Sequence, residues 1–196
     1  MCFHQKIDKK PEQIEKKFNA QFQFFKEYKP NSHVNGFDFP KTPVIKHTNR
    51  FTIEMLQWGL VPHWATEDWN KAFTLNARME TLNEKPAFKN IIHNRCLVIA
   101  NGFYEWKHQG KVKSKFEIGF GDEIFAFGGI YDENTYSIVT TEARGIMHEI
   151  HNTKHRMPIA LRTLNEMEAW LNGETCMGRE DFTAIQLDPI QLNLFD

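Results

Sequence analysis

The spacing of apolar residues predicts a short helix near the start of the chain and a long series of strands after it. Behind Pro11, whose missing N–H is harmless in a first helical turn, apolar side chains recur at the helical positions Ile14, Phe18, Phe22 and Phe25. Residues 29–43 hold three prolines and one glycine and are expected to form a loop. Strand-like runs then follow at residues 44–47, 51–60, 96–100, 103–107, 115–120, 123–130 and 136–140.

Helices are predicted only at the edges of this strand-rich pattern. Residues 85–93 and 142–150 are expected to form short helices, and the apolar positions from Leu164 to Leu171 predict an amphipathic helix that ends at Gly173. Strands and helices do not alternate as they do in βαβ units. We therefore expect an α+β fold, with a curved, barrel-like, mostly antiparallel sheet and peripheral helices.

Length and composition indicate one domain with a substantial core. The chain has 196 residues, and its 17 Phe and five Trp supply apolar volume for that core. We expect residues 1–196 to form a single domain with a short C-terminal tail from about residue 188. The apolar residues of the tail, Leu192, Leu194 and Phe195, either pack back onto the domain or dock on a partner.

The cysteines and the absence of long apolar runs favour a cytoplasmic protein. Cys2, Cys96 and Cys176 lie far apart and form no CxxC pair, which argues against a disulfide framework or a zinc knuckle. No apolar stretch approaches the roughly 20 residues that a membrane-spanning helix needs. Charged residues also occupy the positions where a signal peptide would be apolar. We expect a cytoplasmic monomer with no membrane partner and no cofactor.

Three histidines raise the question of a metal site. His148, His151 and His155 have spacings that suit one face of a helix. However, Asn152-Thr153 and Pro158 interrupt such a helix, and the nearby carboxylates form no second cluster. We therefore expect no metal.

Charge is unevenly distributed along the chain. The net charge is −1, but residues 71–115 contain nine basic and three acidic side chains. A basic surface of this kind suits a nucleic-acid partner. A solvated, charged hairpin would explain the lysines from Lys107 to Lys115 equally well.

Cys2 follows Met1 directly, and its chemistry is distinctive. Removal of Met1 would give Cys2 a free α-amine beside its thiol, a 1,2-aminothiol that no internal residue can offer. An α-amine has a pKa near 7.7 to 8.0, so it is far more available as a neutral nucleophile than lysine at pH 7. The two groups together capture an aldehyde as an imine and then close it to a thiazolidine.

Three further segments contain polar residues that suit a reactive site. Asn76 to Thr81 offers hydrogen-bonding and phosphate-contacting side chains. Glu105 stands among aromatic residues in the segment Asn101 to Trp106, and apolar surroundings raise a carboxyl pKa toward neutrality. The third segment joins Ile150-His151-Asn152 to Arg156-Met157-Pro158.

Taken together, these segments resemble the SOS response-associated peptidase family, the SRAP domain. Besides Met1-Cys2, the chain carries the family segments Trp58-Gly59-Leu60-Val61-Pro62, Asn76 to Thr81, Arg95 to Trp106, and Thr140-Thr141 leading to Ile150-His151 and Arg156-Met157-Pro158. The resemblance runs from residue 1 to about residue 172. It implies a protein that cross-links to abasic sites in single-stranded DNA, with a possible abasic-site lyase activity and autocatalytic removal of Met1.

The resemblance also implies roles for individual residues. Cys2 would attack the ring-opened abasic deoxyribose, and Asn76 would orient the amine and the sugar. Glu105 would promote ring opening and imine formation as an acid and base, and His151 would be a second proton-transfer group. The remaining implied contacts are to DNA: Arg78 and Arg156 would hold phosphates, Trp64 and Trp106 would give apolar surface to bases or sugars, and Pro40 would be a wedge beside the lesion.

Two departures from the family pattern matter. Where the family commonly has Met-Cys-Gly-Arg, this chain has Phe3 and His4, and His4 is expected to be a weaker phosphate ligand than arginine. The segment before Arg156 is three residues longer than usual, so both His151 and His155 are candidates. The spacing from Thr140 favours His151.

Two other functions are compatible with these residues. Cys2, Glu105 and His151 would also suit a cysteine peptidase that acts on other proteins. A module that binds modified DNA without covalent chemistry is the second alternative, and its binding would survive replacement of Cys2.

Overall fold

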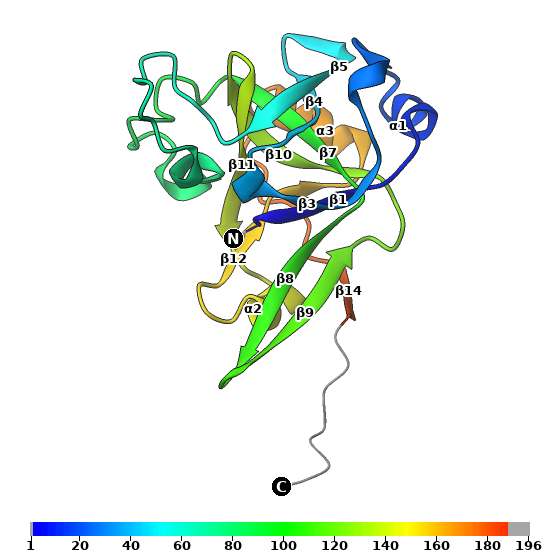
Figure 1. The fold of residues 1–196 in the computed structure, drawn as a ribbon, viewed down its shortest axis with the longest axis vertical. Coiled ribbons are helices and arrows are strands. Elements are labelled where there is room, and N and C mark those ends of the chain that lie inside the picture. The colour runs from blue at the N-terminus through cyan, green and yellow to red at the C-terminus, as the bar shows by residue number, and fades with distance from the viewer. Residues whose placement is uncertain (1, 188–196) are drawn as a thin grey trace, which may run out of the picture.

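The computed structural model describes residues 2–187, and these fold around two curved sheets (Figure 1). The smaller sheet has the strand order β14-β9-β8-β1-β3. Its strands are β1 (His4–Ile7), β3 (Asn31–Asn35), β8 (Gly102–Gln109), β9 (Val112–Gly119) and β14 (Thr183–Gln186). All of its pairings are antiparallel. Strands β8 and β9 form a long hairpin that projects from the rest of the molecule (Figure 1).

The larger sheet has nine strands and holds most of the core. Its main path is β12-β11-β10-β7-β4-β5-β2, with β13 paired to β10 and β6 paired to β11. The bounds are β2 (Gln21–Phe22), β4 (Lys41–Lys46), β5 (Asn49–Trp58), β6 (Asn76–Arg78), β7 (Arg95–Ala100), β10 (Phe125–Asp132), β11 (Thr135–Glu142), β12 (Arg156–Pro158) and β13 (Ala160–Leu161). Strand β10 is buried along its whole length because side chains cover both of its faces.

In residues 2–187, three short α-helices lie outside the sheets. They are α1 (Pro11–Phe18), α2 (Ile146–Ile150) and α3 (Leu164–Leu171), and short 3-10 turns supplement them. Helix α3 begins with a capping box between Thr163 and Glu166, and buries Trp170 against the larger sheet, where the indole N–H donates to the Cys96 carbonyl. The segment between β5 and β7 forms a lobe of turns on one side of the molecule (Figure 1).

The architecture confirms the predicted α+β domain on curved, mostly antiparallel sheets. Each of the seven predicted strand runs overlaps an observed strand, and the helix ending near Gly173 is present, with Gly173 at φ +88°. Cys96 is fully buried in the core, as its apolar run indicated. The predicted tail from about residue 188 lies outside the described residues.

Three local predictions were wrong. The first helix stops at Phe18 because Asn19 adopts a left-handed conformation (φ 49°), and Phe22 lies in a strand. Residues 85–93 form successive turns rather than a helix, closed mainly by bonds three residues apart. Of residues 142–150 only Ile146–Ile150 is helical, since Glu142 pairs with Arg156 at the end of β11.

The expected loop over residues 29–43 was also wrong in part. It contains β3, a polar strand whose sequence carries no apolar alternation, and the first half of β4. In the part of the chain from residue 2 to residue 187, no helix has the length and apolar character needed to cross a membrane.

Candidate active site

Cys2 lies just before β1, the strand of the smaller sheet that pairs with β8 on one side and with β3 on the other. Strand β1 pairs with β8 through Gln5↔Phe103 and Lys6↔Gly102. Carrying this antiparallel register back toward the N-terminus brings the start of the chain alongside Glu105 and Trp106. The Cys2 side chain is fully buried, and its Sγ lies 3.9 Å from the His4 carbonyl. Burial, reinforced by the negative charge of Glu105, raises the pKa of the Cys2 thiol, so the sulfur is held as a neutral thiol.

Asn76 connects Cys2 to the larger sheet. Strand β6 runs parallel to β11, with Asn76 opposite Ile138, and the preceding Leu75 carbonyl accepts a bond from the buried Trp58 indole. The Asn76 Nδ2 donates to the Cys2 carbonyl at 3.0 Å. Its Oδ1 is buried and has no hydrogen-bond partner among residues 2–187. A buried amide oxygen without a partner is costly, so this atom is suited to accept from a bound group.

Glu105 and His151 face each other from different elements. Glu105 lies on β8 and His151 follows directly after α2, and the Glu105 Oε2 is 4.0 Å from the His151 Nε2. Both residues are buried. Burial raises the pKa of Glu105 to about 7 and lowers the pKa of His151 to about 4. Near neutral pH the histidine is therefore uncharged and the carboxyl is close to half-protonated, so the contact is not a fixed ion pair.

The tautomer of His151 follows from its second nitrogen. The backbone N–H of Arg156 donates to His151 Nδ1 at 3.0 Å, so Nδ1 is unprotonated and the neutral ring carries its proton on Nε2, toward Glu105. The neighbouring Asn152 fastens this loop to the β8 strand. It accepts from the His108 N–H at 3.0 Å and donates to the His108 carbonyl at 2.7 Å.

Two cavities meet the residues around Cys2. The smaller, about 300 Å³, is polar and is lined by His4, Glu105, Trp106, His108, Lys113, His151 and Thr153. The larger, about 600 Å³, is mostly apolar, and its lining includes Phe3, Trp64, Trp69, Phe73, Asn76, Arg78 and Lys85. Cys2 contacts the lining of the larger cavity through Asn76, and the charge of Glu105 links it to the smaller one.

A family model gives this geometry its context. The model described as SOS response associated peptidase (SRAP) matches residues 1–193. The chain belongs to the SRAP family. Among curated relatives, the abasic site processing protein YoqW of Bacillus subtilis (strain 168) is 36% identical over 158 residues, which cover 74% of this chain and 68% of the relative. The abasic site processing protein HMCES of Gallus gallus is 30% identical over 165 residues and is matched over 48% of its length.

Solved structures agree with the fold of this SRAP protein. A crystal structure of a protein from Bacteroides thetaiotaomicron superposes with a TM-score of 0.86 at 32% identity, covering 95% of this chain and 92% of the other. A protein from Bordetella bronchiseptica, 16% identical, has a TM-score of 0.75 and covers 96% of this chain, which shows that the fold persists at low identity.

The four residues proposed for chemistry in this SRAP chain lie close together. Cys2, Asn76, Glu105 and His151 are linked by the contacts described above. The ring of His155, the alternative histidine, has other partners: it stacks on His148 at 4.2 Å, and its Nδ1 is 3.2 Å from the His148 carbonyl. Among residues 2–187, no group of three or more His, Cys, Asp or Glu side chains could hold a metal ion.

The residues proposed for DNA contact are placed in three ways. Arg78 and the exposed Trp64 line the larger cavity, and Trp106 lines the smaller one. His4 also lines the smaller cavity, with its ring 4.9 Å from that of Trp106. Pro40 lies in neither, since it lines a separate cavity of about 200 Å³. The DNA-binding roles of these residues stay predictions.

Arg156 has a different set of contacts from the one that its predicted role requires. Its guanidinium donates to both Glu80 oxygens, at 2.9 and 2.8 Å, and to the Thr140 carbonyl at 2.7 Å. Although burial favours the neutral acid, bonds from Arg156 and Thr141 hold the pKa of Glu80 below its ordinary value. A phosphate would have to compete with Glu80, and the observed contacts instead fix the backbone that binds His151.

Sequence reasoning missed several residues that contact the candidate site. Asn152 and Glu80 lie inside segments that the sequence singled out, but nothing in their local pattern shows that they bind His108 and Arg156. His33 and Lys115 approach His4 from β3 and β9, and no spacing in the sequence indicates that contact.

Proposed function

We propose that this protein recognises abasic sites in single-stranded DNA and links to them covalently through Cys2 after loss of Met1. Two observations support the proposal: the arrangement of Cys2 between Asn76 and the Glu105–His151 pair, and the match to relatives that are named abasic site processing proteins. The buried, unpartnered Asn76 Oδ1 carries the proposal, because it offers an acceptor for an amine or a sugar hydroxyl beside Cys2.

The covalent step balances without a cofactor. The Cys2 α-amine adds to the aldehyde carbon of the ring-opened deoxyribose, and the resulting carbinolamine loses one water to give an imine. The Cys2 thiol then adds to the imine carbon, its proton passes to the nitrogen, and a five-membered thiazolidine closes. A neutral thiol is the form held by the buried sulfur, and it supplies the proton that this closure needs.

Glu105 and His151 supply the proton transfers in this scheme. With its pKa at about 7, Glu105 gives a proton to the departing sugar oxygen or hydroxyl and takes one back from the amine. His151, neutral and protonated on Nε2, presents this N–H to the Glu105 carboxyl 4.0 Å away, and the carboxylate form is favoured when the two groups close to hydrogen-bond distance. The same residues promote the reverse reaction, since each step is reversible.

Two further activities belong to the same proposal. Elimination of the 3′ phosphate from the imine would give an abasic-site lyase. Hydrolysis of the Met1–Cys2 bond would consume one water and expose the amine, with Glu105 as the base. We further propose that the protein acts as a cytoplasmic monomer. A cysteine peptidase acting on other proteins is the alternative, but the buried neutral thiol of Cys2 is poorly suited to attack an external peptide.

The intact mass of the protein tests this function. Purified protein is incubated with a single-stranded oligonucleotide that carries one natural abasic site, and its mass is measured with and without the DNA. We expect the species lacking Met1 to gain the oligonucleotide mass less one water, and protein that retains Met1 to stay unmodified. The Cys2→Ala variant should give no adduct, and the Cys176→Ala variant, which loses a thiol far from the site, should react as wild type does. An equal adduct with Cys2→Ala would overturn the proposal.

A further inference from the structure

His4 belongs to a chain of hydrogen-bonding groups on one face of the smaller sheet. His33 Nε2 lies 3.1 Å from His4 Nδ1, and Lys115 Nζ lies 3.5 Å from His33 Nδ1. The pairing Trp106↔Lys115 and the alternation of side chains along β8 place Tyr104, Trp106 and Lys115 on a common face. His4 contacts Trp106 and His33 contacts Tyr104 on that face.

Lys115 sets the direction of both hydrogen bonds in the series Lys115–His33–His4. An ammonium group can only donate, so His33 Nδ1 must accept and the neutral His33 ring carries its proton on Nε2. That proton points at His4 Nδ1, which therefore accepts as well. The neutral His4 ring then carries its own proton on Nε2. Because burial lowers the pKa of His4 to about 4, with His33 and Lys115 adding to the effect, the ring is neutral at pH 7 and its tautomer matters.

The ammonium group of Lys115 lies over two aromatic rings of this face. Lys115 Nζ lies 4.4 Å from the centre of the Tyr104 ring and 5.7 Å from that of Trp106. His4, Lys113 and His108 line the smaller cavity together with Glu105 and His151. A hydrogen-bond donor at His4, in a cavity that Lys113 also lines, suits an anionic oxygen that enters this cavity.

We propose that Lys115 and His33 are positioning residues that fix the tautomer of His4, so that its Nε2–H donates to a backbone phosphate oxygen of the bound DNA. This inference rests on the proposed function, since it supplies the strand that enters the cavity. The proposal explains how a neutral histidine can bind a phosphate at a position where an arginine would supply a permanent charge. The charge of Lys115 acts on the phosphate through two oriented, neutral imidazoles.

Two-bond proton–nitrogen NMR correlations test the tautomer without any DNA. At pH 7 the wild-type protein should show both His4 and His33 protonated on Nε2. The Lys115→Met variant keeps the stem but loses the charge, and it should show mixed tautomers at both rings. Lys111→Met removes the same charge from the tip of the same hairpin and should leave both spectra unchanged. A wild-type His4 protonated on Nδ1 would overturn the inference.

Binding and reaction are then measured separately. A single-stranded oligonucleotide with a tetrahydrofuran abasic analogue, which has no aldehyde, reports reversible binding. We expect Kd to rise roughly three- to tenfold for Lys115→Met and for His33→Leu, the range that corresponds to one ordinary hydrogen bond and so to a phosphate bond that is weakened but not lost. His33→Gln, whose amide can both accept and donate, should restore binding to within about twofold of wild type.

The natural abasic oligonucleotide separates the two proposals. At saturating DNA, Lys115→Met and His33→Leu should cross-link at the wild-type rate, because they act on binding alone. Kd values equal to wild type for both variants would overturn the positioning role of Lys115 and His33 and leave the proposed function standing. A wild-type protein that binds the analogue but forms no adduct with the natural site would instead overturn the proposed function.

Discussion

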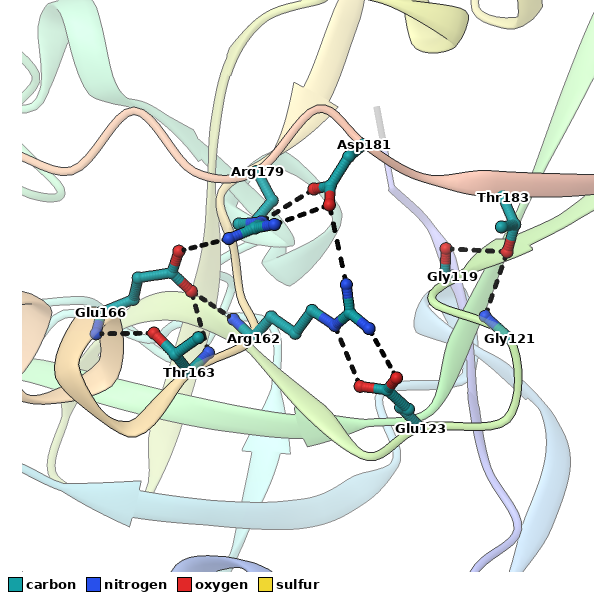
Figure 2. Close-up of polar contacts among 9 residues, drawn as sticks. All are labelled: Gly119, Gly121, Glu123, Arg162, Thr163, Glu166, Arg179, Asp181 and Thr183. Atoms are coloured by element: carbon teal, nitrogen blue, oxygen red, sulfur yellow. Dashed lines mark hydrogen bonds and ion pairs between the residues drawn. The ribbon is translucent and has the colours of Figure 1, made fainter.

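Two clusters of charged residues in this molecule show how environment decides what a carboxyl group does. On the surface beside α3, Arg162 and Arg179 join Glu123, Glu166 and Asp181 in a network in which every group has a partner (Figure 2). In the candidate active site, Glu105 and His151 are buried, and their side chains lie 4.0 Å apart. The carboxyl groups of the surface network stay ionised, whereas burial favours the neutral forms of Glu105 and His151.

The pKa values express this difference. Hydrogen bonds from Arg179 hold the pKa of Asp181 below its ordinary value, and those from Arg162 do the same for Glu123. Burial instead favours the neutral forms of Glu105 and His151, because it raises the pKa of the acid and lowers the pKa of the base. The surface network fastens the segment that leads into β14, as Figure 2 shows, whereas the buried pair is the one that we propose for proton transfer. We infer that burial of Glu105 and His151 lowers the free energy of unfolding near neutral pH or below it, and that the same burial gives the two groups the protonation states that the proposed chemistry needs.

The largest expected effect comes from removing the buried carboxylate. Glu105→Gln keeps the shape of the side chain but cannot exchange a proton, so the rate of cross-linking at saturating DNA should fall by about 100-fold or more. The Glu123→Gln variant, which makes the same change in the surface network, should react at close to the wild-type rate. The rates are measured by denaturing electrophoresis of the adduct, and equal losses in both variants would contradict the contrast.

The difference in unfolding free energy between Glu105→Gln and the wild-type protein should depend on pH. The folded pKa of Glu105, about 7, lies above its value of 4.5 without the fold, so the folded state binds more protons between these values and loses stability as pH rises through them. Glu105→Gln should therefore gain about 2 to 3 kcal/mol relative to wild type between pH 5 and pH 8.

His151 has the opposite sign, which makes the variant comparison necessary. Its folded pKa of about 4 lies below 6.5, so it adds stability as pH rises from about 4 to 6.5. The two effects partly cancel in the wild-type protein. Urea unfolding of wild type and Glu105→Gln at both pH values gives the difference, and a difference that does not change with pH would show that Glu105 is ionised in the folded protein at both.

A smaller effect is expected at the residue that fastens the His151 loop. Asn152→Ala removes both bonds to His108, so His151 should lose its alignment and cross-linking should slow by about tenfold, with little change in Kd. Asn172→Ala also removes an amide, the one that binds Arg50 beside α3, and is the matched control. Single-turnover rates decide the matter, and equal rates for Asn152→Ala and wild type would show that the loop does not need this anchor.

The smallest effect is expected in the surface network. Arg179→Met removes the partner of Glu166 and Asp181, but exposed ion pairs contribute little, so we expect a loss of less than about 1 kcal/mol of unfolding free energy. Added salt should shrink that loss further, because it screens exposed charges. Cross-linking should be unchanged. A loss of unfolding free energy larger than this, and unchanged by salt, would contradict the view that the network behaves as a set of exposed ion pairs.

The sequence by itself determined the reactive groups and much of the fold. Alternation of apolar residues located the seven predicted strands, because burial of one or both faces of a strand leaves a pattern in consecutive residues. The position of Cys2 next to Met1 defined an aminothiol, and the aromatic neighbours of Glu105 indicated a raised pKa before any contact was known. Each of these properties depends on residues that are close together in the chain.

Only the tertiary structure decided which polar groups meet. Nothing local to Arg156 shows that Glu80 neutralises it, and the polar strand β3 brings His33 to His4 although its sequence resembles a loop. The end of α1 was likewise set by the left-handed Asn19 rather than by the apolar spacing. The physical reason is that a hydrophobic period specifies a face but not a partner. Partners depend on sheet register and on the orientation of single hydrogen bonds across elements far apart in the chain.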